Sequence, residues 1–156
     1  DEHPVIFTDK HGNSIARIQE SPNGRDFWMR GGATAKFFIK LAAEGIASAY
    51  RQYKQDERSR GHVLSVIGHH ASLTVAEGVD NMLRRKYGIN DLVFPWVVPD
   101  GNSSGATSLI GFIRMMAADE QGQHDGYQPG QHVLYASYGA GGTGNFFVVE
   151  IGGGAA

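Results

Sequence analysis

The 156-residue sequence contains no cysteine. This absence excludes disulfide bonds, thiolate metal sites and a cysteine nucleophile within the chain. No apolar run reaches the roughly 18 residues of a membrane span, and no basic block is long enough to indicate a nucleic-acid surface. The first residues, Asp1 to Pro4, do not have the composition of a signal peptide. We therefore expect a cytoplasmic protein that binds neither membrane nor nucleic acid.

Charged residues are also few, at 19% of the chain against 41% hydrophobic residues, and the net charge is −2. This balance argues against disorder. The length suits one domain with a sizeable core, so we predict a single domain over residues 1–156. Glycine is abundant, with 22 residues, and many of them stand in turn-like stretches. Tight backbone geometry is therefore expected to matter.

The hydrophobic pattern alternates between strand-like and helix-like segments. A hairpin is predicted from the short strands Val5–Phe7 and Ile15–Ile18, whereas Phe27–Met29 is only a short apolar patch. Helices are predicted over 34–55, 72–87 and 104–118, and further strands over 63–67, 93–98, 132–137 and 145–151. This order predicts an α/β fold with a mixed sheet of about five strands, helices on its faces and a final antiparallel pair.

The glycine-rich residues 139–144 match the pattern G-x-G-x-x-G. In dinucleotide-binding proteins a helix follows these glycines, so that its N-terminus meets the pyrophosphate. Here a strand follows, which argues against a dinucleotide. Two interpretations stay open: a plain tight hairpin, or a turn whose backbone N–H groups form an oxyanion hole.

Residues 101–105 match G-x-S-x-G, the nucleophile elbow of serine hydrolases, with Ser103 as the nucleophile. Either Asp119 or Asp125, followed by His132, would complete a triad in the usual chain order. However, His132 begins a predicted strand only about 30 residues after Ser103, which leaves little room for the usual intervening elements. A small serine hydrolase is therefore an alternative rather than the main hypothesis.

His69 and His70 follow the predicted strand over 63–67. Adjacent side chains of an extended chain point to opposite sides, which is poor geometry for binding one metal ion. Ser72 is a good N-cap for the next helix. His69 would then lie at a strand-to-helix junction, where α/β folds collect ligands. A functional His69 and a purely structural one are both compatible with the pattern.

The helix predicted after Ser72 ends in the basic residues 84–86. Positive charge suits the C-terminal end of a helix dipole. These side chains could also dock an acidic partner, and a solvated helix end is the simpler interpretation.

Three of these motifs, taken together, resemble the C-terminal half of a type III β-ketoacyl-acyl-carrier-protein synthase, in the thiolase superfamily. That family has His-Gln-Ala-Asn after one strand, Gly-Asn-Thr-Ser-Ala after the next, and a Gly-Phe-Gly-Gly-Gly turn before the last strand. This chain has His69-His70-Ala71-Ser72, Gly101-Asn102-Ser103-Ser104-Gly105-Ala106 and Tyr138-Gly139-Ala140-Gly141-Gly142 in the same order, after Met29-Arg30-Gly31 before the long helix.

The resemblance implies half of a thiolase-like fold and an acyltransferase of the β-ketoacyl synthase type. His69 and Asn102 would donate hydrogen bonds to the thioester carbonyl of a malonyl unit and stabilise the enolate as carbon dioxide leaves. Backbone N–H groups at Gly139, Ala140 and Gly141 would hold the oxyanion of the acyl group. The nucleophilic cysteine of the family lies in an N-terminal half that this sequence does not contain, so the isolated chain is expected to be inactive.

The resemblance also implies partners. We expect an N-terminal half or subunit that carries the cysteine, acyl-coenzyme A or acyl-carrier-protein thioesters as substrates, a homodimer or heterodimer, no metal, no cofactor, and a place in fatty acid or polyketide biosynthesis. The sequence departs from the family at His70, Ser72 and Ala140, and at Thr74, where a basic residue for carrier-protein docking is often found. The alternative from another class is a noncatalytic subunit of a heteromeric ketosynthase.

Overall fold

The structure, a computed structural model, describes residues 5–8, 10–22, 24–29, 31–69, 72–94, 107–116, 126–139 and 143–152. The chain divides into two compact units, residues 1–38 and residues 39–156. That the whole chain forms one domain stays a prediction. None of the described helices is long and apolar enough to cross a membrane.

The first unit contains a three-stranded antiparallel sheet in the order β1-β2-β3. Its strands are β1 (Val5–Thr8), β2 (Ser14–Ser21) and β3 (Gly24–Met29). The turn between β1 and β2 contains Gly12 at φ 80°, a left-handed conformation that glycine adopts without a Cβ clash. The predicted hairpin is confirmed. The third strand was not predicted, because its mixed polar and apolar residues do not alternate.

The long helix α1 (Gly31–Gln55) begins before the predicted Thr34 and ends at the predicted residue. Its buried stripe repeats at spacings of three and four, as expected for a helix that packs one face on a core; its buried apolar residues are Ala42, Ala43, Ile46, Ala47 and Tyr53. A short 3-10 helix, η1 (Glu57–Ser59), follows it, and the carboxylate of Asp56 caps this turn by accepting from the backbone N–H of Arg58.

The second unit is built on a mixed sheet of four strands, in the order β5-β4-β6-β7. Its strands are β4 (Leu64–Gly68), β5 (Leu92–Val93), β6 (His132–Tyr138) and β7 (Gly144–Glu150). Strands β5, β4 and β6 are parallel, and β7 is antiparallel to β6. The predicted mixed sheet is confirmed, with four described strands instead of about five. Residues 95–98 of the strand predicted over 93–98 lie outside the described residues.

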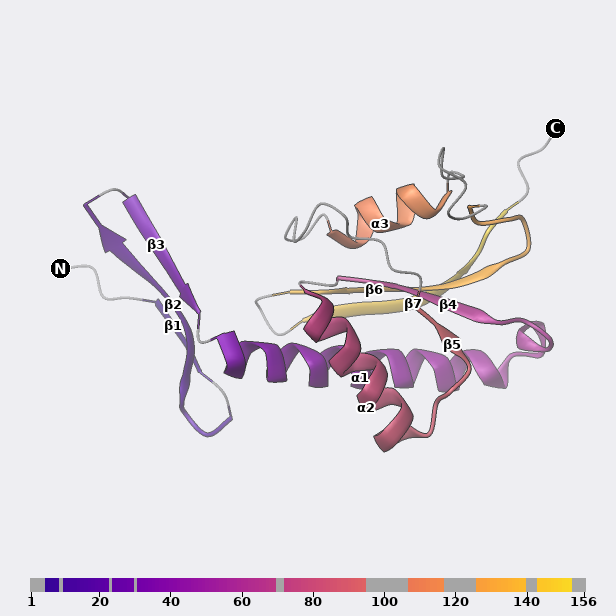
Figure 1. The fold of residues 1–156 in the computed structure, drawn as a ribbon, viewed down its shortest axis with the longest axis horizontal. Coiled ribbons are helices and arrows are strands. Elements are labelled where there is room, and N and C mark those ends of the chain that lie inside the picture. The colour runs from indigo at the N-terminus through magenta and orange to yellow at the C-terminus, as the bar shows by residue number, and fades with distance from the viewer. Residues whose placement is uncertain are drawn as a thin grey trace. The chain divides into compact units, whose positions relative to one another are not determined.

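Helices cover both faces of this sheet (Figure 1), with α3 (Thr107–Met116) on one face and α1 and α2 (Leu73–Tyr87) on the other. On the α3 face a buried cluster forms around Ile67, Met115, Tyr127, Val133 and Ile151. Helix α2 begins at the N-cap Ser72 and ends at Gly88 in a left-handed conformation, and both boundaries were predicted. Because β4 and β6 are parallel, their carboxyl ends and the segments that follow them lie at the same edge of the sheet.

Candidate functional site

His69 lies at the carboxyl edge of the sheet, directly after β4. Its backbone N–H donates to the carbonyl of Ala136 at 3.0 Å, which extends the pairing of β4 with β6 by one residue. The His69 side chain is only 9% exposed. Its ring meets the ring of Tyr138 edge-on, with centroids 5.5 Å apart and an interplanar angle of 88°. The structure thus brings His69 beside the last residue of β6, where the glycine turn begins.

An aromatic layer fixes the surroundings of His69. Tyr138 is buried, and burial raises the pKa of its phenol above the ordinary value, so the ring beside His69 stays neutral. The Tyr138 ring stacks on Phe146 with centroids 6.4 Å apart and a 13° tilt. Phe146 packs in turn against Gly45 of α1, where a Cβ would lie 2.2 Å from the ring. The position of the imidazole therefore depends on packing that reaches from β6 through β7 to α1.

A backbone hydrogen bond closes the glycine turn. The N–H of Gly139 donates to the carbonyl of Thr143 at 3.1 Å. This donor is therefore engaged inside the turn. Ala140 and Gly141 lie outside the described residues, so an oxyanion hole at this turn stays a prediction that rests on those two N–H groups.

The N-terminus of α2 follows His69 closely in the chain. The Ser72 hydroxyl accepts a hydrogen bond from the backbone N–H of Val75 at 3.3 Å, and the positive end of the α2 dipole therefore lies three or four residues beyond the histidine. Asn102, the second predicted donor, lies outside the described residues, between β5 and α3. Because β5 is parallel to β4, its carboxyl end lies at the same edge as that of β4. The role of Asn102 stays a prediction.

His132 lies at the opposite edge of the sheet, at the amino end of β6. It is buried, its Nδ1 is hydrogen-bonded to the hydroxyl of Tyr53, and its Nε2 lies 3.8 Å from a carboxylate oxygen of Glu150. Its ring also stacks on His62, with centroids 4.2 Å apart. These contacts were not foreseen, because Tyr53 comes from α1, far away in the sequence.

The serine hydrolase alternative requires Ser103 and either Asp119 or Asp125, and these three residues lie outside the described residues. The only described member of that triad is His132, and its two ring nitrogens face Tyr53 and Glu150. The described ranges contain no cluster of histidine, aspartate and glutamate that could hold a metal ion.

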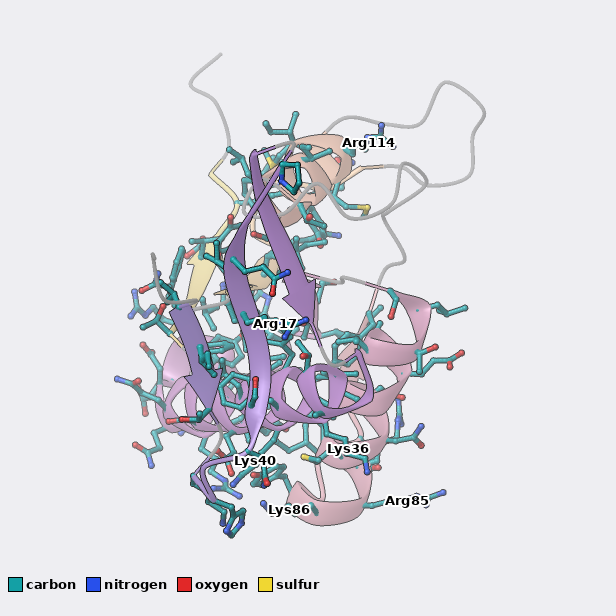
Figure 2. All side chains as sticks on the ribbon, turned by 90° about the vertical axis from the view of Figure 1, so that its left-hand side faces the viewer. Arg17, Lys36, Lys40, Arg85, Lys86 and Arg114 are labelled. Atoms are coloured by element: carbon teal, nitrogen blue, oxygen red, sulfur yellow. The ribbon has the colours of Figure 1, made fainter. Side chains whose placement is uncertain are left out.

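The basic end of α2 carries mostly paired charges. Figure 2 shows Lys40 of α1 and Lys86 of α2 on the same side of the molecule. Both ammonium groups approach Glu44, at 3.7 and 3.8 Å, and Arg84 pairs with Asp80 at 2.9 Å. These pairs favour a solvated helix end over a dedicated docking surface. The cluster also lies about 20 Å along α2 from its N-terminus, at 1.5 Å per residue.

Comparisons with known proteins point to one fold. A scan against protein-family models finds no match, and no curated protein matches the sequence. Among solved structures, the chain is similar to the β-ketoacyl-[acyl carrier protein] synthase III, FabH, from Thermus thermophilus. The two chains are 22% identical with a TM-score of 0.56, and the match covers 97% of this chain but 46% of that one. The chain therefore has the thiolase-like fold of a β-ketoacyl synthase III over about half the length of that enzyme.

Proposed function

We propose that this chain is the C-terminal half of a β-ketoacyl synthase-like enzyme that condenses acyl and malonyl thioesters. The observation that carries the proposal is the placement of His69. It is a nearly buried imidazole at the carboxyl edge of a parallel sheet, beside the start of the glycine turn, in a fold shared with a β-ketoacyl synthase III. Ligands of open α/β sheets gather at this edge.

The proposed reaction uses His69 and Asn102 as two neutral donors. Both N–H groups bind the thioester carbonyl oxygen of the malonyl unit. The bond to the terminal carboxylate breaks, carbon dioxide leaves, and the electron pair passes into the enolate whose oxygen the two donors stabilise. The enolate carbon then attacks the acyl thioester on the cysteine of the N-terminal half. The carbon–sulfur bond of that thioester breaks, and the thiolate is released.

The partner half has a candidate docking surface on α3. Leu109, Ile113 and Met116 are 52%, 59% and 45% exposed, and their spacing places them on one side of the helix. The opposite side of α3 is anchored to the sheet, where the Ser108 hydroxyl lies 3.0 Å from that of Tyr135. An apolar helix stripe in contact with water favours a protein partner. Since the chain spans about half of FabH, we infer that the cysteine-bearing half covers this stripe.

The catalytic proposal is tested by combining the chain with a cysteine-bearing N-terminal half and measuring carbon dioxide release from a malonyl thioester. His69→Ala and Asn102→Ala are each expected to lower the rate by about 10²–10³, as for the loss of one oxyanion donor. His11→Ala removes an exposed histidine of the first unit and serves as the matched control. If His69→Ala and Asn102→Ala both release carbon dioxide at the wild-type rate, the catalytic role is rejected.

The same experiment separates the alternative function. A noncatalytic subunit would need only its fold, so activity would survive both substitutions and disappear when the chain is left out. If the chain is instead a serine hydrolase, a fluorophosphonate probe should label the wild type and not Ser103→Ala.

Association of the two halves is tested separately by sedimentation of their mixture. Ile113→Asp puts a charge in the middle of the α3 stripe, and we expect the dissociation constant to rise about tenfold or more, since burying a charge without a partner is strongly unfavourable. Val63→Asp, an equally exposed apolar site before β4, is the control. Equal effects of the two variants would show that α3 is not the contact.

A further inference from the structure

The two outer strands of the four-stranded sheet differ in how well they are protected against pairing with a further strand. β5 forms one edge with two residues, whereas β7 forms the other with seven. Pairing with β6 runs along the whole of β7 without an irregularity in register, and β6 is its only hydrogen-bonded neighbour among the described strands. Proteins protect such edges with short strands, prolines, lysines or bulges. β7 has none of these, and its sequence, Gly-Asn-Phe-Phe-Val-Val-Glu, favours strand pairing.

A cleft of about 330 Å³ lies between β7 and the last turns of α1, and it also reaches His132 of β6. Three consecutive residues, Phe146, Phe147 and Val148, line it. Because successive side chains of a strand point to opposite faces, a cleft reaches three in a row only where it meets the strand's backbone edge. The opposite wall comes from the last turns of α1, through Ala49 and Tyr53. We call this hollow the β7 cleft. It combines strand hydrogen-bonding groups that pair with no described strand with a space lined by both apolar and polar side chains.

The charged end of the β7 cleft contains two carboxylates, Asp56 and Glu150, and one guanidinium, Arg58. Asp56 and Arg58 bind each other, with Nε of Arg58 3.0 Å from the Asp56 carboxylate, and these hydrogen bonds lower the pKa of Asp56 to about 2. Glu150 is 60% exposed and lies 3.8 Å from His132, and the guanidinium of Arg58 also interacts with it electrostatically. A cationic group at this end of the cleft would therefore meet a favourable potential.

We propose that the β7 cleft binds an extended peptide strand that pairs with the free edge of β7. Main-chain hydrogen bonds would provide the affinity, alternate apolar side chains would fill the cleft, and a lysine or arginine would meet Glu150. A second copy of this chain is a poorer occupant, because β7 contains no basic residue to place opposite Glu150. The proposal does not require a catalytic role for His69, although Phe146 lines the cleft and also stacks on the Tyr138 ring that lies beside His69.

A short peptide of alternating valine and threonine with a C-terminal lysine, labelled with fluorescein, tests the proposal by fluorescence anisotropy. We expect saturable binding to the full chain, slower hydrogen exchange of the β7 amides, and loss of binding when the central residue of the peptide is proline. Replacing the lysine of the peptide by glutamate should weaken binding by about 2–5-fold or more, the scale of an exposed ion pair.

Two variants of the protein locate the site. Glu150→Gln should weaken the lysine peptide about 2–5-fold and leave the glutamate peptide unchanged or tighter. Ala49→Trp fills the cleft and should weaken both peptides at least tenfold, with folding checked by circular dichroism. Glu77→Gln, an exposed carboxylate of α2, is the control and should bind as the wild type does.

Three results would overturn the proposal. The first is no binding at millimolar peptide. The second is binding that tolerates the proline peptide and both site variants. The third is a concentration-dependent dimer of the chain that protects the β7 amides and excludes the peptide, which would assign the edge to a second copy.

Discussion

Gly45→Ala should destabilise the protein, although alanine is the better helix former. A Cβ at this position would lie 2.2 to 2.4 Å from three atoms of the Phe146 ring. The ring cannot move away freely, because a Cβ at Gly144 would also come within 2.5 Å of it and Tyr138 stacks on it. Overpacking of this kind costs about 1–3 kcal/mol, and the gain in helix propensity offsets about 1 kcal/mol. We expect a net loss of up to about 2 kcal/mol in the free energy of unfolding.

Urea unfolding followed by circular dichroism measures this loss. With a slope of about 2 kcal/mol per molar, the urea midpoint should fall by up to about 1 M. Gly32→Ala makes the same change in the same helix where no atom lies within 4 Å of the new Cβ, and it should be neutral or slightly stabilising. Combining Gly45→Ala with Phe146→Leu should recover part of the loss. If Gly45→Ala is as stable as Gly32→Ala, the packing of α1 on β7 described above is wrong.

Three further predictions concern single contacts. Ser72→Ala removes the cap of α2 and should lower the free energy of unfolding by about 1 kcal/mol, as measured by urea unfolding. Ser72→Asp should keep the cap and the wild-type stability. Tyr53→Phe leaves Nδ1 of the buried His132 without its hydroxyl partner and should lower stability by about 1–3 kcal/mol; no change in the urea midpoint would contradict the contact. Arg58 holds the pKa of Asp56 at about 2, so the stability it contributes is present above the ordinary pKa and is lost as the pH falls through about 2. Thermal unfolding of Asp56→Asn across acidic pH should therefore show a smaller loss between about pH 4 and pH 2 than the wild type shows.

The elements that the sequence predicted best are those whose signals are local. Ser72 and Gly88 mark the two ends of α2. A serine hydroxyl and a left-handed glycine help to satisfy the unpaired backbone groups at the ends of a helix, wherever that helix packs. The apolar run of β4 predicted a strand covered on both faces, and it is almost wholly buried. β3 was missed because its residues have neither a strand period nor a helix period. Its pairing with β2 provides the information that its own sequence does not contain.

The surroundings of His69 could not be predicted in the same way. The position of His69 at the end of a strand could be predicted from the neighbouring residues alone, and the structure places His69 there. Its contact with Tyr138 depends on β4 lying beside β6, which are separated in the sequence by α2, β5 and α3. The support from Phe146 depends further on the register of β6 with β7. Sequence periodicity determines which face a residue occupies but not which strand lies next to it.

The same reasoning explains why two buried histidines beside one sheet have different surroundings. His69 follows a parallel strand and His132 begins one, so the direction of the strands places them at opposite edges of one sheet. Both are buried, yet His132 contacts Tyr53 and Glu150, whereas His69 lies beside a neutral ring at the edge where ligands of α/β sheets gather. An imidazole in the second setting is suited to donating a hydrogen bond to a developing oxyanion. Strand direction, more than burial or residue type, is therefore the property that separates the candidate catalytic histidine from the structural one.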